Sequence, residues 1–107
     1  MSEKELQDRP VASAQKLYTF LSLLPKQASL DSYQHEALNQ DLRTIEYIIS
    51  KLNEANSKED WRTVWRMVQE WKRSVGGYVG DDLGQRLNQL VEDLWRDVLD
   101  SYSESIK

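Results

Sequence analysis

Apolar residues recur along this chain three and four positions apart, the spacing that places side chains on one face of an α-helix. The clearest example is found in residues 38–52, where the intervals between apolar positions alternate between four and three, as in a heptad repeat. No stretch shows the alternation of apolar and polar residues that is typical of a β-strand. The hydrophobic pattern therefore predicts an all-α fold.

Prolines set the limits of the first helical segment. Pro10 suits a first helical turn, where its missing N–H costs no hydrogen bond, and Asp8 can cap that turn. Pro25 disfavours a helical conformation of the residue before it. We therefore expect the first helix at about 10–24, after a frayed N-terminal segment at 1–9.

Capping residues and glycines set the limits of the other helices. Ser29 or Asp31 can cap the second helix, and Ser57 begins a capping box before the third. Gly76 and Gly77 stop the third helix because paired glycines readily adopt the left-handed conformation of a helix end. Short connections then predict one domain at 10–107, an antiparallel four-helix bundle with helices at about 10–24, 31–54, 58–75 and 82–104.

The apolar faces of the four segments predict the core of this bundle, and two faces are wider than one core uses. The excess on the first and last helices predicts self-association, as a homodimer; the competing interpretation is a terminal helix that packs deeply in a monomer. The expected core comprises Leu17, Leu21, Leu42, Ile45, Ile49, Trp61, Val68, Leu87, Leu90 and Leu94, and the expected self-association residues are Phe20, Leu23, Trp95, Leu99, Tyr102 and Ile106.

Basic residues are concentrated in the third helical segment, although the net charge of the chain is -4. Helical angles place Arg62, Arg66 and Arg73, here called the arginine stripe, on one side of that helix. Trp65 falls between the stripe and the core face. Arginine and tryptophan often dominate the binding energy of interfaces. These four residues are therefore the expected contacts with a partner protein that has an acidic surface; the alternative is a solvated edge.

Four acidic residues of the last helical segment form a second charged feature. They are spaced so that they share one side of the helix, and such a surface is usually solvated. Alternatively the acidic ridge pairs with the arginine stripe within the bundle, between two copies of the chain, or with another protein. The ridge consists of Asp93, Asp97, Asp100 and Glu104.

Two charged side chains project into apolar sectors. Asp41 lies within the apolar face of the second helix, so its carboxylate must find a hydrogen-bond donor or lie near the end of the bundle. Lys72 lies within the apolar face of the third helix and can reach outward or pair with such an acid. A structural pair or a surface placement explains both better than a functional site.

The residues that most reactive sites require are scarce. The chain has no cysteine, which removes disulfides and thiol chemistry, and its single histidine, His35, rules out a multi-histidine metal centre. The glycine sites lack the lysine of a phosphate-binding loop, and the motifs of di-metal bundles are missing. We expect no enzyme, no catalytic residue, no cofactor and no metal.

Composition also bears on location and partners. No apolar run is long enough to span a bilayer, and the charged first residues do not resemble a signal peptide, so we expect a cytoplasmic protein without membrane contact. We expect a small non-enzymatic protein–protein interaction module, an adaptor, regulator or assembly subunit that presents helix faces to its partner. The alternative is a nucleic-acid-associated subunit that uses the arginine stripe, which the acidic balance of the chain opposes.

Overall fold

The described part of the chain, residues 2–107 in a computed structural model, folds into four helices. They are α1 (Glu3–Gln27), α2 (Ser32–Glu54), α3 (Lys58–Trp71) and α4 (Asp81–Ser105). No residue in this described range belongs to a β-strand. The predicted all-α, four-helix fold is confirmed.

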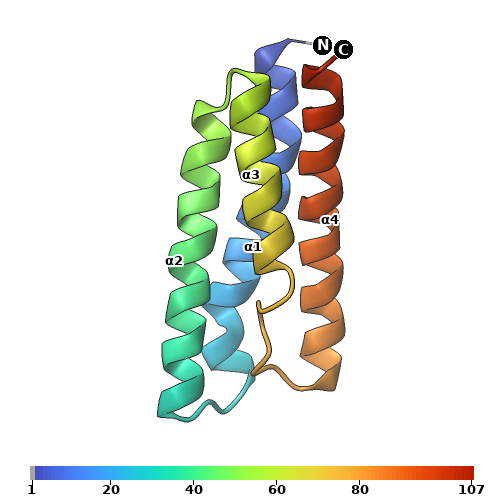
Figure 1. The fold of residues 1–107 in the computed structure, drawn as a ribbon. Helices are drawn as coiled ribbons and strands as arrows, with labels where there is room; N and C mark the ends of the chain where they lie inside the picture. Colours follow the sequence, from blue (N-terminus) through green and yellow to red (C-terminus); the bar gives the residue numbers. More distant parts are fainter. Residues whose placement is uncertain (1) are drawn as a thin grey trace.

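Each helix packs against two others, so the four helices form a closed ring around the core. The helix α1 contacts α2 and α4, and α3 contacts the same two helices. The chain descends along α1, ascends along α2, descends along α3 and ascends along α4, in the orientation of Figure 1. The resulting bundle measures 45 × 21 × 20 Å along its principal axes. The seam between α1 and α4 is therefore opposite the seam between α2 and α3.

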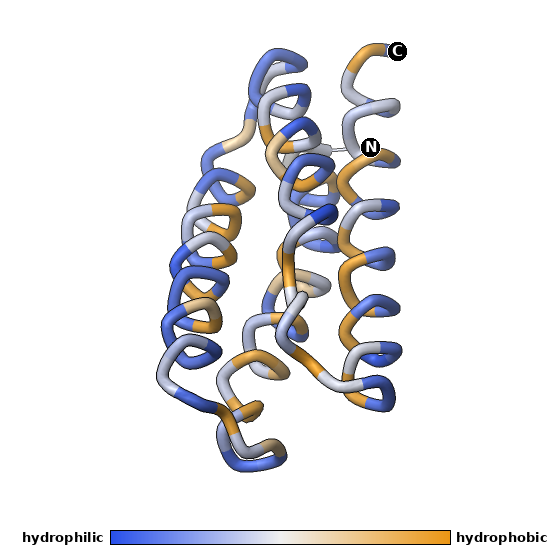
Figure 2. The backbone as a smooth tube through the Cα atoms, turned by 60° about the horizontal axis from the view of Figure 1, so that its bottom comes forward, coloured by the Kyte–Doolittle hydropathy of each residue, from blue (hydrophilic) through white to orange (hydrophobic). Residues whose placement is uncertain are grey.

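The core lies between the inward faces of the helices. Figure 2 shows the hydrophobic residues of α2 and α4 on the sides that face the other helices. None of the helices within residues 2–107 is long and apolar enough to cross a membrane. Of the predicted core residues, Leu42, Ile49 and Leu90 are only half-buried at its edge, whereas the others are buried: Leu17, Leu21, Ile45, Trp61, Val68, Leu87 and Leu94.

The helix α1 begins at Glu3, so the predicted start at residue 10 was wrong. The hydroxyl of Ser2 caps the helix by accepting a hydrogen bond from the Glu5 N–H at 3.3 Å. Leu6 is buried one turn later, and Pro10 lies inside the helix with its ring buried. Burial of these two side chains stabilises the first turns of the helix. The sequence before Pro10 has too few apolar residues to indicate this burial.

The predicted end of α1 at residue 24 was also wrong, because the helix continues through Pro25 to Gln27. The Ala28 N–H donates to the Leu24 carbonyl at 2.9 Å, which closes a last turn around the proline. Leu24 is almost completely buried. Its burial against the neighbouring helices outweighs the weak local preference of the residue before a proline for extended backbone.

The limits of α2 and α4 agree with the prediction to within one residue. Of the two caps considered for α2, Asp31 is the one that forms. Its carboxylate accepts from the Gln34 N–H at 2.8 Å, and the Gln34 side chain accepts from the Asp31 N–H at 2.9 Å. This reciprocal capping box satisfies two backbone donors that the helix leaves free.

The helix α3 begins as predicted, at Lys58. The Ser57 hydroxyl accepts from the Asp60 N–H at 3.2 Å. The Asp60 carboxylate accepts from the Asn56 N–H at 3.1 Å, one residue before the cap, and this bond lowers the pKa of Asp60. The capping signal in the sequence was therefore correct, with Asn56 in place of Ser57 as the second donor.

The helix α3 ends at Trp71, before the predicted limit of residue 75. Residues 72–80 form a connection of successive turns, in which the Val75 N–H donates to the Trp71 carbonyl at 2.9 Å. Gly76 has a left-handed φ of 72°, but it lies five residues after the end of α3, so the prediction that it stops this helix was wrong. A Cβ at Gly76 would lie 1.9 Å from Cδ2 of Leu87, so α4 packs closely against this turn.

Candidate functional site

The arginine stripe is only partly helical. Arg62 and Arg66 are exposed on α3 and lie one turn apart on the same side. Arg73 is exposed as well, but it follows the end of α3, so the expected single helix beneath all three arginines is wrong. Among the side chains that the structure describes, those of residues 2 and 4–107, none of the three arginines forms an ion pair. Their guanidinium groups are thus available to a partner.

Two acidic residues accompany the arginine stripe. Glu59 and Glu70 are exposed on α3, three residues before Arg62 and four residues after Arg66. Residues at these intervals are neighbours on a helix surface. Two anions therefore accompany the three arginines, which makes this surface less positive than the arginines alone suggest.

Trp65 lies at the seam between α3 and α4. It is half-buried, and its ring centroid is 6.0 Å from that of Tyr102 on α4, with the ring planes tilted by 37°. Its Nε1–H is buried and has no hydrogen-bond acceptor in the described part of the chain. Trp65 therefore packs mainly against α4, and only the remaining exposed part of its ring is available to a partner.

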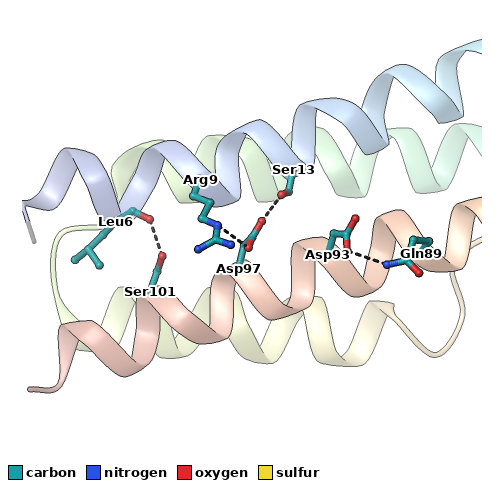
Figure 3. A network of polar contacts seen from close by, with 7 residues as sticks. All are labelled: Leu6, Arg9, Ser13, Gln89, Asp93, Asp97 and Ser101. Atoms are coloured by element: carbon teal, nitrogen blue, oxygen red, sulfur yellow. Dashed lines mark hydrogen bonds and ion pairs between the residues drawn. The ribbon is translucent and has the colours of Figure 1, made fainter.

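The acidic ridge of α4 does not face the arginine stripe. Asp97 is buried against α1, where it accepts a hydrogen bond from the Ser13 hydroxyl, and its Oδ1 lies 3.2 Å from Nε of Arg9 (Figure 3). Asp93 accepts from the Gln89 amide of its own helix at 3.0 Å. The expected solvation of the ridge is wrong at Asp97, and so is its pairing with the arginines inside the bundle. The reason is that α1 covers the side of α4 on which Asp97 lies.

Further polar contacts close the same end of the bundle. The Ser101 hydroxyl donates to the Leu6 carbonyl at 2.7 Å, which joins α4 to the first turns of α1 (Figure 3). The Gln7 amide donates to the carbonyls of Asn53 and Ala55 at 3.2 and 2.7 Å. These bonds tie the start of α1 to α4 and to the end of α2.

Asp41 finds the hydrogen-bond donors that its position required. Its carboxylate accepts from Nε1 of Trp71 at 3.1 Å, from the Gly76 N–H at 3.1 Å and from the Tyr78 hydroxyl at 2.8 Å. Burial of the hydroxyl, together with the nearby carboxylate, raises the pKa of Tyr78. Asp41 thus attaches the connection of residues 72–80 to α2, which is a structural role.

Lys72 does not pair with Asp41 and reaches outward, the other outcome considered from the sequence. Its Nζ lies 2.6 Å from the Glu92 carboxylate and 4.4 Å from the centroid of the Trp95 ring. Nε1 of Trp95 is buried without an acceptor in the described residues. Lys72 therefore covers one face of Trp95 and joins the end of α3 to α4.

The expected self-association residues are less exposed than their helical angles suggested. Phe20 belongs to the core, with 9% of its surface exposed. Trp95, Leu99 and Tyr102 are half-buried on α4. Only Leu23 and Ile106 count as exposed, at 39% and 58%. Self-association stays a prediction, with less apolar surface to support it.

A groove between α1 and α4 is the feature that the sequence did not indicate. It has a volume of about 700 Å³ and lies where the second half of α1 meets the first half of α4. Helical angles could place Lys16, Phe20 and Leu23 near one another, but only the packing of α4 creates the second wall. The residues that define the groove's chemistry are Lys16, Phe20, Leu23, Leu83, Arg86 and Leu90.

No model of a known protein family matches this chain, and no curated protein and no solved structure matches it. Among residues 2–107, no group of three or more histidine, aspartate or glutamate side chains is arranged to hold a metal ion.

Proposed function

We propose that this protein is a small non-enzymatic interaction module, an adaptor, regulator or assembly subunit, that binds a partner protein through the arginine stripe. The observation that carries the proposal is that Arg62, Arg66 and Arg73 are exposed and form no ion pair with the side chains of residues 2 and 4–107. Arginine binds carboxylates through two parallel hydrogen bonds, so an acidic protein surface is the expected partner.

An acidic protein suits this surface better than nucleic acid, the alternative partner. Nucleic-acid binding draws on several phosphate contacts at once and usually on a broad basic surface. Here Glu59 and Glu70 accompany the arginines, and the whole chain has a net charge of -4. A patterned protein surface can place acids opposite the arginines and bases opposite the glutamates, whereas a polyphosphate cannot.

We also propose a cytoplasmic location, and two features of the composition support the non-enzymatic and cytoplasmic parts of the proposal. His35, the only histidine, is exposed on α2. The chain has no cysteine, which fits a reducing compartment. Homodimerisation through Leu23 and Ile106 is a further proposal, and light scattering of the protein at micromolar concentration tests it. A mass equal to one chain would contradict the dimer.

The test of the arginine stripe is capture of the partner by a double variant, Arg62→Glu with Arg66→Glu. Wild type and variant are immobilised at equal amounts and exposed to an extract of cells that produce the protein, and captured proteins are identified by mass spectrometry. We expect one acidic protein to be bound by wild type and lost by the variant. Cross-linking should then place acidic residues of that protein next to α3.

A matched control separates a specific surface from the change in net charge. Lys4→Glu with Arg43→Glu changes the net charge by the same amount, and both residues are exposed on other helices, α1 and α2. This control should retain the partner. Circular dichroism must show unchanged helix content and melting temperature for both double variants. Retained capture by the arginine variant, with the same salt dependence as wild type, would contradict the proposal.

A further inference from the structure

The groove between α1 and α4 combines apolar walls with two cations, and Asp82 lies one turn before one of them, Arg86, on α4. Leu23 is exposed, and Leu83 and Leu90 are half-buried along it. Lys16 and Arg86 also line the groove and are exposed, and neither forms an ion pair with a described side chain, in residues 2 and 4–107. No acidic residue is among those that line it.

The groove occupies only part of the seam between these helices. Toward the start of α1 the seam is closed by polar contacts, in which Ser101 bonds Leu6 and Asp97 binds Arg9 and Ser13 (Figure 3). The lining of the groove begins at Ala12 and extends to Gln27. At a rise of about 1.5 Å per residue, this stretch of α1 is about 24 Å long. The α1 wall of the groove therefore matches about four turns of another helix, whereas the α4 wall, from Leu83 to Leu90, matches about two turns.

We propose that the groove binds an amphipathic helix of a partner protein, with apolar residues along one face and acidic residues at its margins. Two adjacent helices form a surface into which a third helix can pack, with its apolar side chains at intervals of three and four. Carboxylates at the margins would pair with Lys16 and Arg86, the two lining cations that have no ion pair among the described side chains.

This site is independent of the arginine stripe. The helix α3 contacts α2 and α4 and not α1, so the groove and the exposed side of α3 lie on different faces of the ring. A partner could occupy one without touching the other. Failure of one proposal therefore leaves the other unaffected, and variants of each surface serve as controls for the other.

The experiment uses two designed helical peptides of about 16 residues, the length that spans the groove. Both have leucines at intervals of three and four, and they differ only in carrying glutamate or lysine at the margins. Each is titrated into ¹⁵N-labelled protein, and amide shifts are followed by NMR. We expect the glutamate peptide to shift resonances of residues 12–27 and 83–90, and the lysine peptide to leave them unchanged.

Variants of the groove connect the shifts to the proposed contacts. Lys16→Glu with Arg86→Glu should weaken binding of the glutamate peptide about tenfold or more, since two charge pairs become repulsive. Leu23→Gln removes exposed apolar surface without disturbing the core, and should also weaken binding. Lys4→Glu with Arg43→Glu, and Arg62→Glu with Arg66→Glu, should leave the affinity unchanged.

Several outcomes would overturn this inference. Equal binding of the two peptides, or no shift up to about 1 mM glutamate peptide, would remove the basis for an acidic helix. Shifts confined to α3 would assign the acidic peptide to the arginine stripe instead. If dilution of the protein alone moves the resonances of residues 12–27 and 83–90, the occupant is a second copy of this chain and the proposal fails.

Discussion

Two aspartates of this protein have the same exposure, 8%, and are held in different ways. Asp41 accepts hydrogen bonds from three uncharged donors, on Trp71, Gly76 and Tyr78. Asp97 has an arginine and a serine hydroxyl as partners. The comparison shows that a nearly buried carboxylate in this bundle needs donors and does not need a cation.

The partners also differ in what they are attached to. The partners of Asp97 lie on α1, a continuous helix that packs against α4. The backbone partner of Asp41 is in the connection of residues 72–80, which has no continuous helical hydrogen bonding of its own. Asp41 therefore determines the path of the chain, whereas Asp97 adds specificity to a contact that apolar packing already makes.

Removal of each carboxylate in turn should give the largest difference in stability between the two sites. We expect Asp41→Ala to lower the free energy of unfolding by about 2 to 4 kcal/mol, because three donors lose their acceptor. Asp97→Ala should lower the free energy of unfolding by about 1 kcal/mol, because the Arg9 side chain is 74% exposed and water can solvate its charge. Urea denaturation followed by circular dichroism measures both. An equal or larger loss for Asp97→Ala would show that the ion pair is the more important anchor.

The glycine that donates to Asp41 should be the next most sensitive position. Gly76→Ala should destabilise the fold by about 1 to 3 kcal/mol, because φ is 72° and the new Cβ would overlap the Leu87 side chain. Gly77→Ala is the matched control, since its Cβ would lie 3.7 Å from the nearest atom, the Ser74 carbonyl oxygen. Thermal unfolding compares the two. A similar loss at both glycines would mean that the turn tolerates no side chain at all.

Removal of the Tyr78 hydroxyl should have the smallest effect on stability, and this effect should depend on pH. Its folded-state pKa is raised, so its contribution is complete below the unfolded value of about 10 and decreases as the pH rises above it. Tyr78→Phe should cost about 1 kcal/mol at neutral pH and should make stability fall less steeply above about pH 10. Urea midpoints from about pH 8 to 11 measure this. Tyr33→Phe, at an 80% exposed position, should keep the wild-type slope.

The four helices were predictable because local signals act over a few residues. Asp31 and Ser57 cap α2 and α3 as expected, whereas α3 ends at Trp71, five residues before the glycine that was expected to stop it. The errors occurred where packing competes with local preference. Pro25 lies within α1 because the burial of Leu24 extends the helix past it. No window of sequence contains the neighbouring helices that supply this burial.

The candidate sites were less predictable than the helices. Arg62 and Arg66 lie exposed as their angles indicated, whereas Trp65 is half-buried against Tyr102. The groove that Lys16 and Arg86 line was missed, because its walls come from helices that are far apart in the sequence. A helical angle gives the direction of a side chain from its own helix axis, and does not identify the element that it meets.

Periodicity, capping and charge are properties of single segments, so they were enough to predict the all-α class and the need of Asp41 for a donor. They were also enough to predict the exposure of Arg62 and Arg66. The packing of the helices determines which donors Asp41 receives and that Asp97 faces α1. It also forms the groove between α1 and α4, whose two cations have no ion pair among the described side chains. These outcomes depend on contacts between segments that are distant in the chain. Such contacts are set by the packing of whole helix faces, which no single segment encodes.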